Sequence, residues 1–567
     1  MLCWLPPGQA AIYRSDRNPE NHDPYNGNEP FRFDGPRNPS QHLQLTMSTA
    51  LSRPLPASAW KPKANPWLIA FVVSLAAFME VLDTSIANVA LPHIAGNMGA
   101  SSDESTWVLT SYLVSNAIVL PITGWLVSLF GRKRFFLICL SLFTLSSLFC
   151  GIAPNLVILL ISRIIQGVGG GGLQPMAQAI LADTFPPEKR GLAFSVYGVT
   201  AVVAPSIGPT LGGWITDSYS WSWIFYINIP VGLFAAAVTW FIYRDRETPA
   251  RKLPIDKVGL MSLVAWVASL QIMLDKGKDL DWFSSPVICI LAAVAAVSFV
   301  FFLIWEFTEK NPIVDLRLFA VRNFRGGTIA ISVAYAVFFA NLVILPQWIQ
   351  GYLGYRSVDA GLVTAPLGIF AVLLAPVMAK IMPKTDARVL ATLAFVGFAA
   401  VFLMRSHYTT GVDTYTLVLP TLLQGIPMAL FFTPLTAIIL SGLSPDKIPA
   451  AAGLSNFVRV FAGGVGTSLI TTGWNNRTIL HHAQLAEQSG VNNPAYTSAL
   501  ADIHTTLGGN MDQAAAFFER SLNAQAAMLG LNDIFWLSSM IFIVIIPLIW
   551  LTKPGKGGGG GAAAGAH

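Results

Sequence analysis

Long apolar stretches separated by short polar segments follow one another along most of this chain. Fourteen of them are long enough to cross a hydrocarbon core of about 30 Å, because an α-helix rises about 1.5 Å per residue. Their approximate limits are 67–95, 105–130, 134–152, 155–182, 190–216, 221–243, 254–274, 286–308, 323–350, 356–380, 387–405, 414–442, 448–474 and 531–551. The pattern predicts an all-α membrane protein, and an even number of spans places both termini on one side.

The composition supports this class. Hydrophobic residues make up 53% of the 567 residues and charged residues 11%, whereas soluble domains contain about 25% charged residues. The four cysteines, Cys3, Cys139, Cys150 and Cys289, have no spacing typical of a disulfide framework or a zinc site. We therefore expect no metal, and the small net charge of +5 gives no indication of nucleic-acid binding.

Basic residues are distributed unevenly between the loops. They concentrate in the even-numbered loops, as in Arg132-Lys133-Arg134, and are sparse in the odd-numbered ones, to which we assign Arg405. Cytoplasmic loops carry an excess of Lys and Arg, so both termini are predicted to be cytoplasmic. Arg163 and Arg459 are the two arginines that fall inside predicted spans.

Three segments fall outside this pattern. Residues 1–66 form an N-terminal segment whose first 46 residues are rich in Asn and Pro and are predicted to be disordered. Either these 46 residues form a cytoplasmic tail or translation starts at Met47, and we expect the latter. A glycine-rich tail covers 553–567. The external segment 475–530 contains an amphipathic stripe that indicates either a helix on the membrane surface or a docking surface for an external partner; the stripe consists of Met511, Ala515, Phe518, Leu522 and Leu529.

Two acids lie near the middle of the first span. Glu80 and Asp83 are spaced i, i+3, and a carboxylate at that depth costs about 2.5–3.5 kcal/mol. Arg163 cannot deprotonate and needs an acid or several carbonyls, for which Asp83 and Glu80 are the candidates. This chemistry favours a site that takes up and releases a proton; the alternative is a fixed ion pair that never titrates.

Glycine and proline form two further patterns. The fifth span is predicted to be a kinked, closely packed helix with a hinge role, on the basis of Gly198, Pro205, Gly208, Pro209, Gly212 and Gly213. A tight cytoplasmic turn is predicted around Gly124, Gly131 and Arg132. The glycines at 167–172 favour close helix packing and not a phosphate-binding loop, because no Lys-Ser/Thr follows them.

Aromatic residues and isolated amides inside several spans suggest a cavity for apolar ligands. The alternative for each is ordinary core or lipid-facing packing. Arg459 either binds an anionic group or pairs across the molecule. The candidates are Gln166, Asn341, Gln347, Phe338, Phe339, Gln424, Met428, Phe432 and Arg459.

These motifs together resemble the 14-span drug:proton antiporter branch of the major facilitator superfamily. The segments LDTSIANVALP (82–92), RIIQGVGGGG (163–172) and GVTAVVAPSIGPTLGG (198–213) are similar to its signatures in the first, fourth and fifth helices. The segments NPIVDLRLF (311–319) and LSNFVRVFAGGVGTS (454–468) are similar to EmrB-type multidrug efflux pumps. Two positions depart from the pattern: Ser128 replaces an aspartate, and Glu80 stands where glutamine is expected.

The resemblance implies a major facilitator fold with a six-helix bundle at 67–243, two extra helices in 244–308 and a second bundle at 309–552. It implies alternating access about a central cavity and export of hydrophobic or amphiphilic compounds from the bacterial inner membrane. It further implies the proton gradient as the energy source, with no cofactor. In this view Asp83, with Glu80, would exchange protons, and Arg163 would hold the deprotonated state. The partners that the resemblance implies are a periplasmic membrane fusion protein and an outer-membrane channel.

Other functions remain open from the residues alone. One is a dedicated exporter of a specific metabolite, fatty acid or siderophore. Another is a polytopic membrane enzyme, which would need a nucleophile or metal constellation at one membrane face. The sequence contains no HExxH and no Walker A motif, which disfavours a metalloprotease and ATP-driven transport.

Overall fold

The computed structural model describes residues 65–242, 256–277, 280–382, 384–444, 446–487, 489, 493–507 and 510–554. Every regular element in these ranges is a helix. The predicted disordered segment, the start at Met47 and nearly all of the glycine-rich tail lie outside the described residues.

The first group of helices runs from residue 66 to residue 242. Its members are α2 (Pro66–Met98), α3 (Ser102–Phe130), α4 (Arg132–Gly151), α5 (Leu156–Gly170), α6 (Leu173–Thr184), α7 (Pro187–Ser218), α8 (Trp223–Tyr226) and α9 (Asn228–Ile242). Two further helices follow, α10 (Lys257–Lys276) and α11 (Pro286–Thr308), with the short η1 (Trp282–Ser284) between them.

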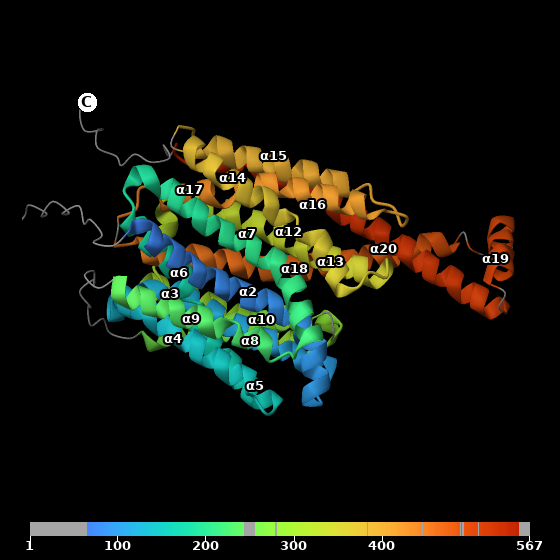
Figure 1. Cartoon of the computed structure of the whole chain (residues 1–567), viewed down its shortest axis with the longest axis horizontal. Coiled ribbons are helices and arrows are strands. Elements are labelled where there is room, and N and C mark those ends of the chain that lie inside the picture. The colour runs from blue at the N-terminus through green and yellow to red at the C-terminus, as the bar shows by residue number, and fades with distance from the viewer. Residues whose placement is uncertain are drawn as a thin grey trace, which may run out of the picture. The chain divides into compact units, whose positions relative to one another are not determined.

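The second group begins after η2 (Leu316–Ala320). It contains α12 (Arg322–Tyr352), α13 (Ser357–Thr364), α14 (Leu367–Ile381), α15 (Ala387–Arg405), α16 (Thr414–Ala429), α17 (Phe432–Leu440), α18 (Ile448–Glu487), α19 (Pro494–Leu507), α20 (Met511–Val544) and α21 (Ile546–Trp550). Among the described residues, thirteen helices are long and apolar enough to span a membrane, and the bent α7 provides a fourteenth. The prediction of fourteen spans is confirmed, and α2 begins and α21 ends at the end of the bundle opposite α19 (Figure 1).

Local sequence sets the helix boundaries. The Asn65 side chain caps α2 by accepting from the Trp67 amide, with Pro66 in the first turn, and Gly99 ends the helix at a φ of 62°. Ser101 and Glu104 form a capping box at the start of α3. Gly131 joins α3 to α4 with a φ of 82°, which explains why the predicted tight turn requires a glycine.

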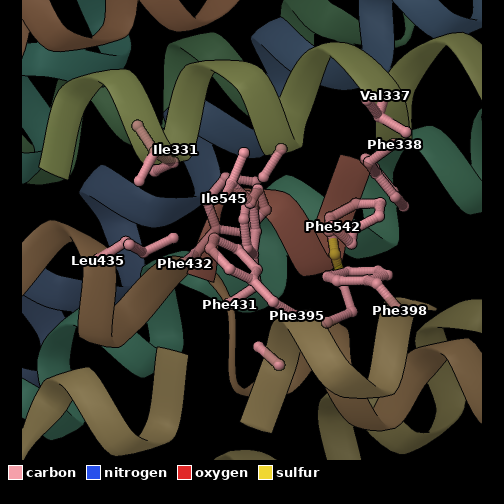
Figure 2. Packing of buried hydrophobic residues seen from close by; sticks show 14 of the residues in the cluster. Ile331, Val337, Phe338, Phe395, Phe398, Phe431, Phe432, Leu435, Phe542 and Ile545 are labelled. Atoms are coloured by element: carbon pink, nitrogen blue, oxygen red, sulfur yellow. The ribbon is translucent and has the colours of Figure 1, made fainter. Parts of the chain in front are cut away.

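The two groups meet along α7 and α18. Helix α7 packs on α2 of its own group and on α13, α14 and α17 of the other, while α18 packs on α3 and α6 as well as on α12 and α20. The second group has its own aromatic core, in which Phe398 lies 4.9 Å from Phe542 and 5.8 Å from Phe338, measured between ring centroids (Figure 2). The same buried cluster takes in Ala117, Leu120 and Ile122 of α3, so the packing of the second group continues across its contact with the first.

The two extra helices lie beside this contact surface. Helix α10 packs on α3 and α18, and Trp266 lies with its ring centroid 5.7 Å from that of Phe457 and 5.4 Å from that of Phe461. Helix α11 packs mainly on α10 and leaves large apolar side chains such as Ile290, Val297 and Phe307 exposed. This exposure suits a helix that contacts lipid.

The predicted external segment 475–530 is helical over most of its length. Helix α18 continues to Glu487, and α20 begins at Met511 and runs unbroken into the last span. Together with α19 they form a hairpin that extends past the ends of the neighbouring helices (Figure 1). Hydropathy falls after residue 474 but the alanine-rich sequence still favours helix, and the hairpin buries Leu522. The predicted stripe therefore does not form a separate surface helix.

Candidate functional site

The predicted ion pair between α2 and α5 is present. The Arg163 Nη1 atom lies 2.6 Å from Asp83 Oδ2, and both side chains are buried. The Arg163 Nε atom donates to the Val108 carbonyl at 2.9 Å, and the guanidinium lies 4.3 Å from the centroid of the Tyr112 ring. The cation is thus held from three sides.

Amides complete the surroundings of Asp83. Its Oδ1 atom accepts from Gln166 Nε2 at 2.9 Å and from Asn228 Nδ2 at 2.7 Å, and Gln166 Oε1 accepts from Arg163 at 2.7 Å. Ser147 bonds both amides. Sequence reasoning placed Gln166 on this polar face but missed Asn228 and Ser147. An asparagine inside the apolar sixth span was the signal for Asn228; for Ser147 we find none.

Glycines allow the helices around this pair to approach closely. A Cβ at Gly167 would lie 2.5 Å from the Tyr112 carbonyl oxygen, and one at Gly171 would lie 2.6 Å from the Asn116 carbonyl oxygen. Gly167 and Gly171 thus allow α5 and the turn into α6 to approach α3, while Gly169 and Gly172 face Cys139 of α4, as predicted for small residues in membranes.

Glu80 does not share the cation of Asp83. It is buried, and its carboxylate accepts from Tyr112 at 3.2 Å, from Asn116 at 3.0 Å and from Gln174 at 2.6 Å. No basic side chain among the described residues forms an ion pair with it. Of the two acids predicted as partners of Arg163, the structure therefore pairs only Asp83.

A polar chain leads from Glu80 into the second group of helices. Gln174 Nε2 donates to Glu80, while Gln174 Oε1 accepts from Arg459 Nη2 at 2.9 Å. Arg459 also donates to Asn456 Oδ1 at 3.1 Å. Arg459 belongs to α18, so this chain crosses the contact surface between the two groups.

A cavity lies at this crossing. Its walls come from α6 and α7 on one side and from α12, α17 and α18 on the other. The lining combines polar and apolar side chains, namely Gln178, Tyr197, Ile331, Phe432, Thr436, Ile439, Leu440, Ala452, Ser455, Asn456 and Arg459. Of the predicted cavity residues, Phe432 and Arg459 line it.

The other predicted cavity residues are not brought together. Phe338 and Met428 belong to the packed core of the second group, Asn341 bonds Val337 and Ser538, and Gln347 is exposed. Phe339 stacks on Tyr335, and Gln424 accepts from Arg405 at 2.8 Å. A helix buries only some of its faces, and residue type alone does not show which face meets a cavity.

The count of buried arginines also needs correction. Arg405 and Arg132 are buried at the ends of their helices, although both were assigned to loops. Arg405 donates to Thr421 and Gln424, and Arg132 pairs with Asp183. Because a long side chain can fold back along its helix, a position at a helix end does not place the charge in water.

The predicted kink in α7 is present as a bend of 45° between Leu192–Pro205 and Ile207–Ser218. Gly208 and Gly212 pack on Ser85 and Ile86 of α2, whereas Gly198 faces Thr433 and Gly213 faces Val358. Ser85 Oγ donates to the Pro205 carbonyl at 3.3 Å. Pro209 has no N–H for that carbonyl, so α2 supplies the hydrogen bond that α7 lacks.

Residues 73–467 match the family model described as Major Facilitator Superfamily. The chain belongs to the major facilitator superfamily. This membership makes it a multi-pass membrane transporter and confirms the predicted fold. The human organic anion transporter MFSD10 (TETRAN) has a similar fold, with a TM-score of 0.57 at 14% identity over 86% of this chain and all of that one.

The chain matches two relatives over nearly their whole length. The multidrug export protein EmrB of Escherichia coli K12 is 45% identical over 499 residues, which is 88% of this chain and 97% of that protein. The fatty acid resistance protein FarB of Neisseria gonorrhoeae is 43% identical over 497 residues, or 87% and 97%. The predicted resemblance to EmrB-type proteins is confirmed.

An ion pair between Arg132 and Asp183 ties the turn between α3 and α4 to α6. Ser128 donates to the Gly124 carbonyl of its own helix, so it forms no ion pair where the resemblance expects an aspartate. Arg132 instead pairs with Asp183 at the end of α6. The acid that holds the turn therefore lies on α6, outside the sequence of the turn itself.

Proposed function

We propose that this protein exports hydrophobic and amphiphilic small molecules in exchange for protons. The observation that carries the proposal is the buried pair of Asp83 and Arg163, at membrane depth, with amide donors on the same carboxylate. Ionisable groups inside membrane spans are functional by default. The export of drugs by the relative named EmrB supports the direction and the substrate class.

Protonation of Asp83 would remove the charge that Arg163 contacts. The pair links α2 to α5, so its loss would change the relative stability of the arrangements that the two groups of helices adopt. A ligand or proton shifts a two-state equilibrium only through such a difference between states. Arg163 keeps acceptors in Gln166 and the Val108 carbonyl, so the neutral state is accessible without leaving the cation bare.

The bent α7 would carry this change to the second group. It contacts α2 through Gly208 and Gly212 and the second group through Gly198 and Gly213. Small residues leave few side chains to interlock, so the surfaces can slide or rock, as alternating access in such transporters requires. In this proposal the central cavity near Arg459 opens alternately to each side.

We also propose the sidedness and the partners. With both termini in the cytoplasm, the hairpin of α18, α19 and α20 extends on the periplasmic side, where it is positioned to contact a membrane fusion protein and, through it, an outer-membrane channel. The hairpin is fastened by His481 with Asp533 at 2.9 Å and His482 with Glu519 at 2.8 Å. A stable projecting element is what a docking partner requires.

The test is proton exchange in everted membrane vesicles energised by respiration, with ethidium as the probe. Ethidium should collapse part of the pH gradient with the wild-type protein, and Asp83→Asn should abolish the response while Asp83→Glu retains some of it. Asp413→Asn is the control, because it changes an exposed N-cap acid to an equally good capping residue. Normal exchange by Asp83→Asn would move the coupling elsewhere, with Glu80 as the first candidate.

A further inference from the structure

Arg459 is a buried cation without a carboxylate. It is 5% exposed, and among the described residues it forms no ion pair. Its hydrogen bonds there run from Nη2 to two neutral oxygens, Gln174 Oε1 and Asn456 Oδ1. The rings of Tyr335 and Phe432, with centroids 4.8 Å and 5.4 Å from the guanidinium carbon, offset part of the desolvation. An unpaired buried charge remains costly, so its position calls for a ligand.

The other buried arginines do not share this combination. Arg163 and Arg132 each pair with an acid. Arg405 resembles Arg459 in having only neutral acceptors, Thr421 and Gln424, but it does not line the cavity between the two groups of helices. Arg459 is thus a buried cation that also lines the small cavity between the two groups of helices.

Asn456 supplies an independent sign of a missing anion. Its Oδ1 atom accepts from Arg459 at 3.1 Å and from Gln178 at 3.3 Å. Both bonds require an acceptor, which fixes the orientation of the amide. Its Nδ2 atom is buried and has no hydrogen-bond partner, although a buried unsatisfied donor is unfavourable. A cation and an unused donor therefore lie side by side on one cavity wall.

The rest of the lining indicates what is attached to the anion. Ile331, Ile439 and Leu440 form an apolar wall, and Ile331 and Phe432 approach from α12 and α17 (Figure 2). The linked carboxyl group, Glu80, already accepts from Tyr112, Asn116 and Gln174. The cavity measures about 10 Å³, room for about one water, so a larger ligand enters only when the two groups of helices that form its walls move apart.

We propose that Arg459 and Asn456 form a subsite for the carboxylate of an amphiphilic monoanion, whose apolar part packs against Ile331, Ile439 and Leu440. The carboxylate accepts from the guanidinium and from Asn456 Nδ2, which pairs the buried charge and satisfies the unused donor. Only the role of this anion as exported cargo rests on the proposed function; its binding does not.

The test is equilibrium binding to the purified full-length protein with two probes of equal chain length, octanoate and octyltrimethylammonium. Arg459→Gln should weaken octanoate binding by about 10- to 100-fold, since it removes charge-assisted hydrogen bonds, and should change the Kd of the cation less than about threefold. Arg459→Lys should retain most of the octanoate affinity. Asn456→Asp should weaken octanoate as Arg459→Gln does, because it places a carboxylate beside the guanidinium.

Arg405→Gln is the matched control, a buried arginine outside the cavity, and should leave both affinities unchanged. Equal weakening of both probes by Arg459→Gln would show a purely structural role and overturn the proposal, as would unchanged octanoate binding by that variant or no octanoate binding by the wild type. Octanoate binding through Arg459 in a protein that exchanges no protons would overturn the proposed function and support the subsite. Proton-coupled export together with octanoate binding that does not depend on Arg459 would support the proposed function and overturn the subsite.

Discussion

Removing both Asp83 and Arg163 should destabilise the protein by less than the sum of the two single removals. Each single replacement leaves one buried group without its charged partner, which costs about 3–5 kcal/mol in buried pairs. We expect values at the lower end. After Asp83→Asn the guanidinium keeps Gln166 and the Val108 carbonyl, and after Arg163→Gln the carboxyl group keeps the amides of Gln166 and Asn228.

The double variant leaves no uncompensated charge. The two single costs should therefore exceed the cost of the double variant by a coupling energy in the upper part of the range of about 0.5–3 kcal/mol that neighbouring residues show. The free energy of unfolding is measured by titration with sodium dodecyl sulfate in mixed micelles and followed by tryptophan fluorescence, for the wild type, both single variants and the double variant.

A second cycle serves as the control. It combines Asp83→Asn with Arg405→Gln, since Arg405 is a buried arginine of the other group whose bonds go to Thr421 and Gln424. The changes in unfolding free energy caused by Asp83→Asn and Arg405→Gln should add within about 0.5 kcal/mol. If the Asp83 and Arg163 variants were equally additive, the 2.6 Å contact would contribute no net stability, and the argument that charge release in this pair biases the transport cycle would fail.

Three further predictions follow from other parts of the structure. Gly208→Val should lower transport and thermal stability together, because even a Cβ there would clash with Ser85, whereas Gly411→Val, at a site with no heavy atom nearby, should lower neither; the readouts are ethidium export and the melting temperature. Met511→Glu with Phe517→Glu, at side chains about half exposed on the hairpin, should abolish drug resistance in cells but spare transport in proteoliposomes; loss in both assays would contradict a docking role. Arg388 holds the pKa of Asp386 below its ordinary value of 3.8 through side-chain hydrogen bonds. The ionised Asp386 therefore stabilises the protein above pH 3.8, and this stabilisation is lost as the pH falls through the lowered pKa. The variant Asp386→Asn, which preserves the cap, should have a lower melting temperature than the wild type at pH 7 and the same melting temperature at strongly acid pH.

The spans and the ion pair could be predicted because their signals are local or unavoidable. A stretch of twenty apolar residues has few alternatives to a membrane helix, and a buried arginine needs a partner, which limited the choice for Arg163 to Glu80 and Asp83. The preference for Asp83 depended on the resemblance. The structure shows the physical reason, since Asn228 and Gln166 converge on Asp83 while Glu80 faces Gln174.

The remaining site depends on how distant helices face one another. Gln174 and Arg459 are 285 positions apart, and no local pattern predicts that they meet. The amides Asn341, Gln347 and Gln424 were grouped by residue type, but the packing directs one to Ser538, one to the surface and one to Arg405. The long hairpin was missed because hydropathy marks where a helix leaves lipid, and a helix can continue beyond that point.

The hydrogen bond from Ser85 to the Pro205 carbonyl links the wetting of the protein interior to its movement. Any rearrangement that draws α7 away from α2 leaves this carbonyl without a donor, and in a membrane interior such a group must find water or another partner. Ser85 lies two positions after Asp83 on the same helix. In the proposed cycle, separation of the two helices would thus admit water beside the acid at the step when a proton reaches or leaves it. The missing amide of one proline would then make hydration of the proton path a consequence of opening.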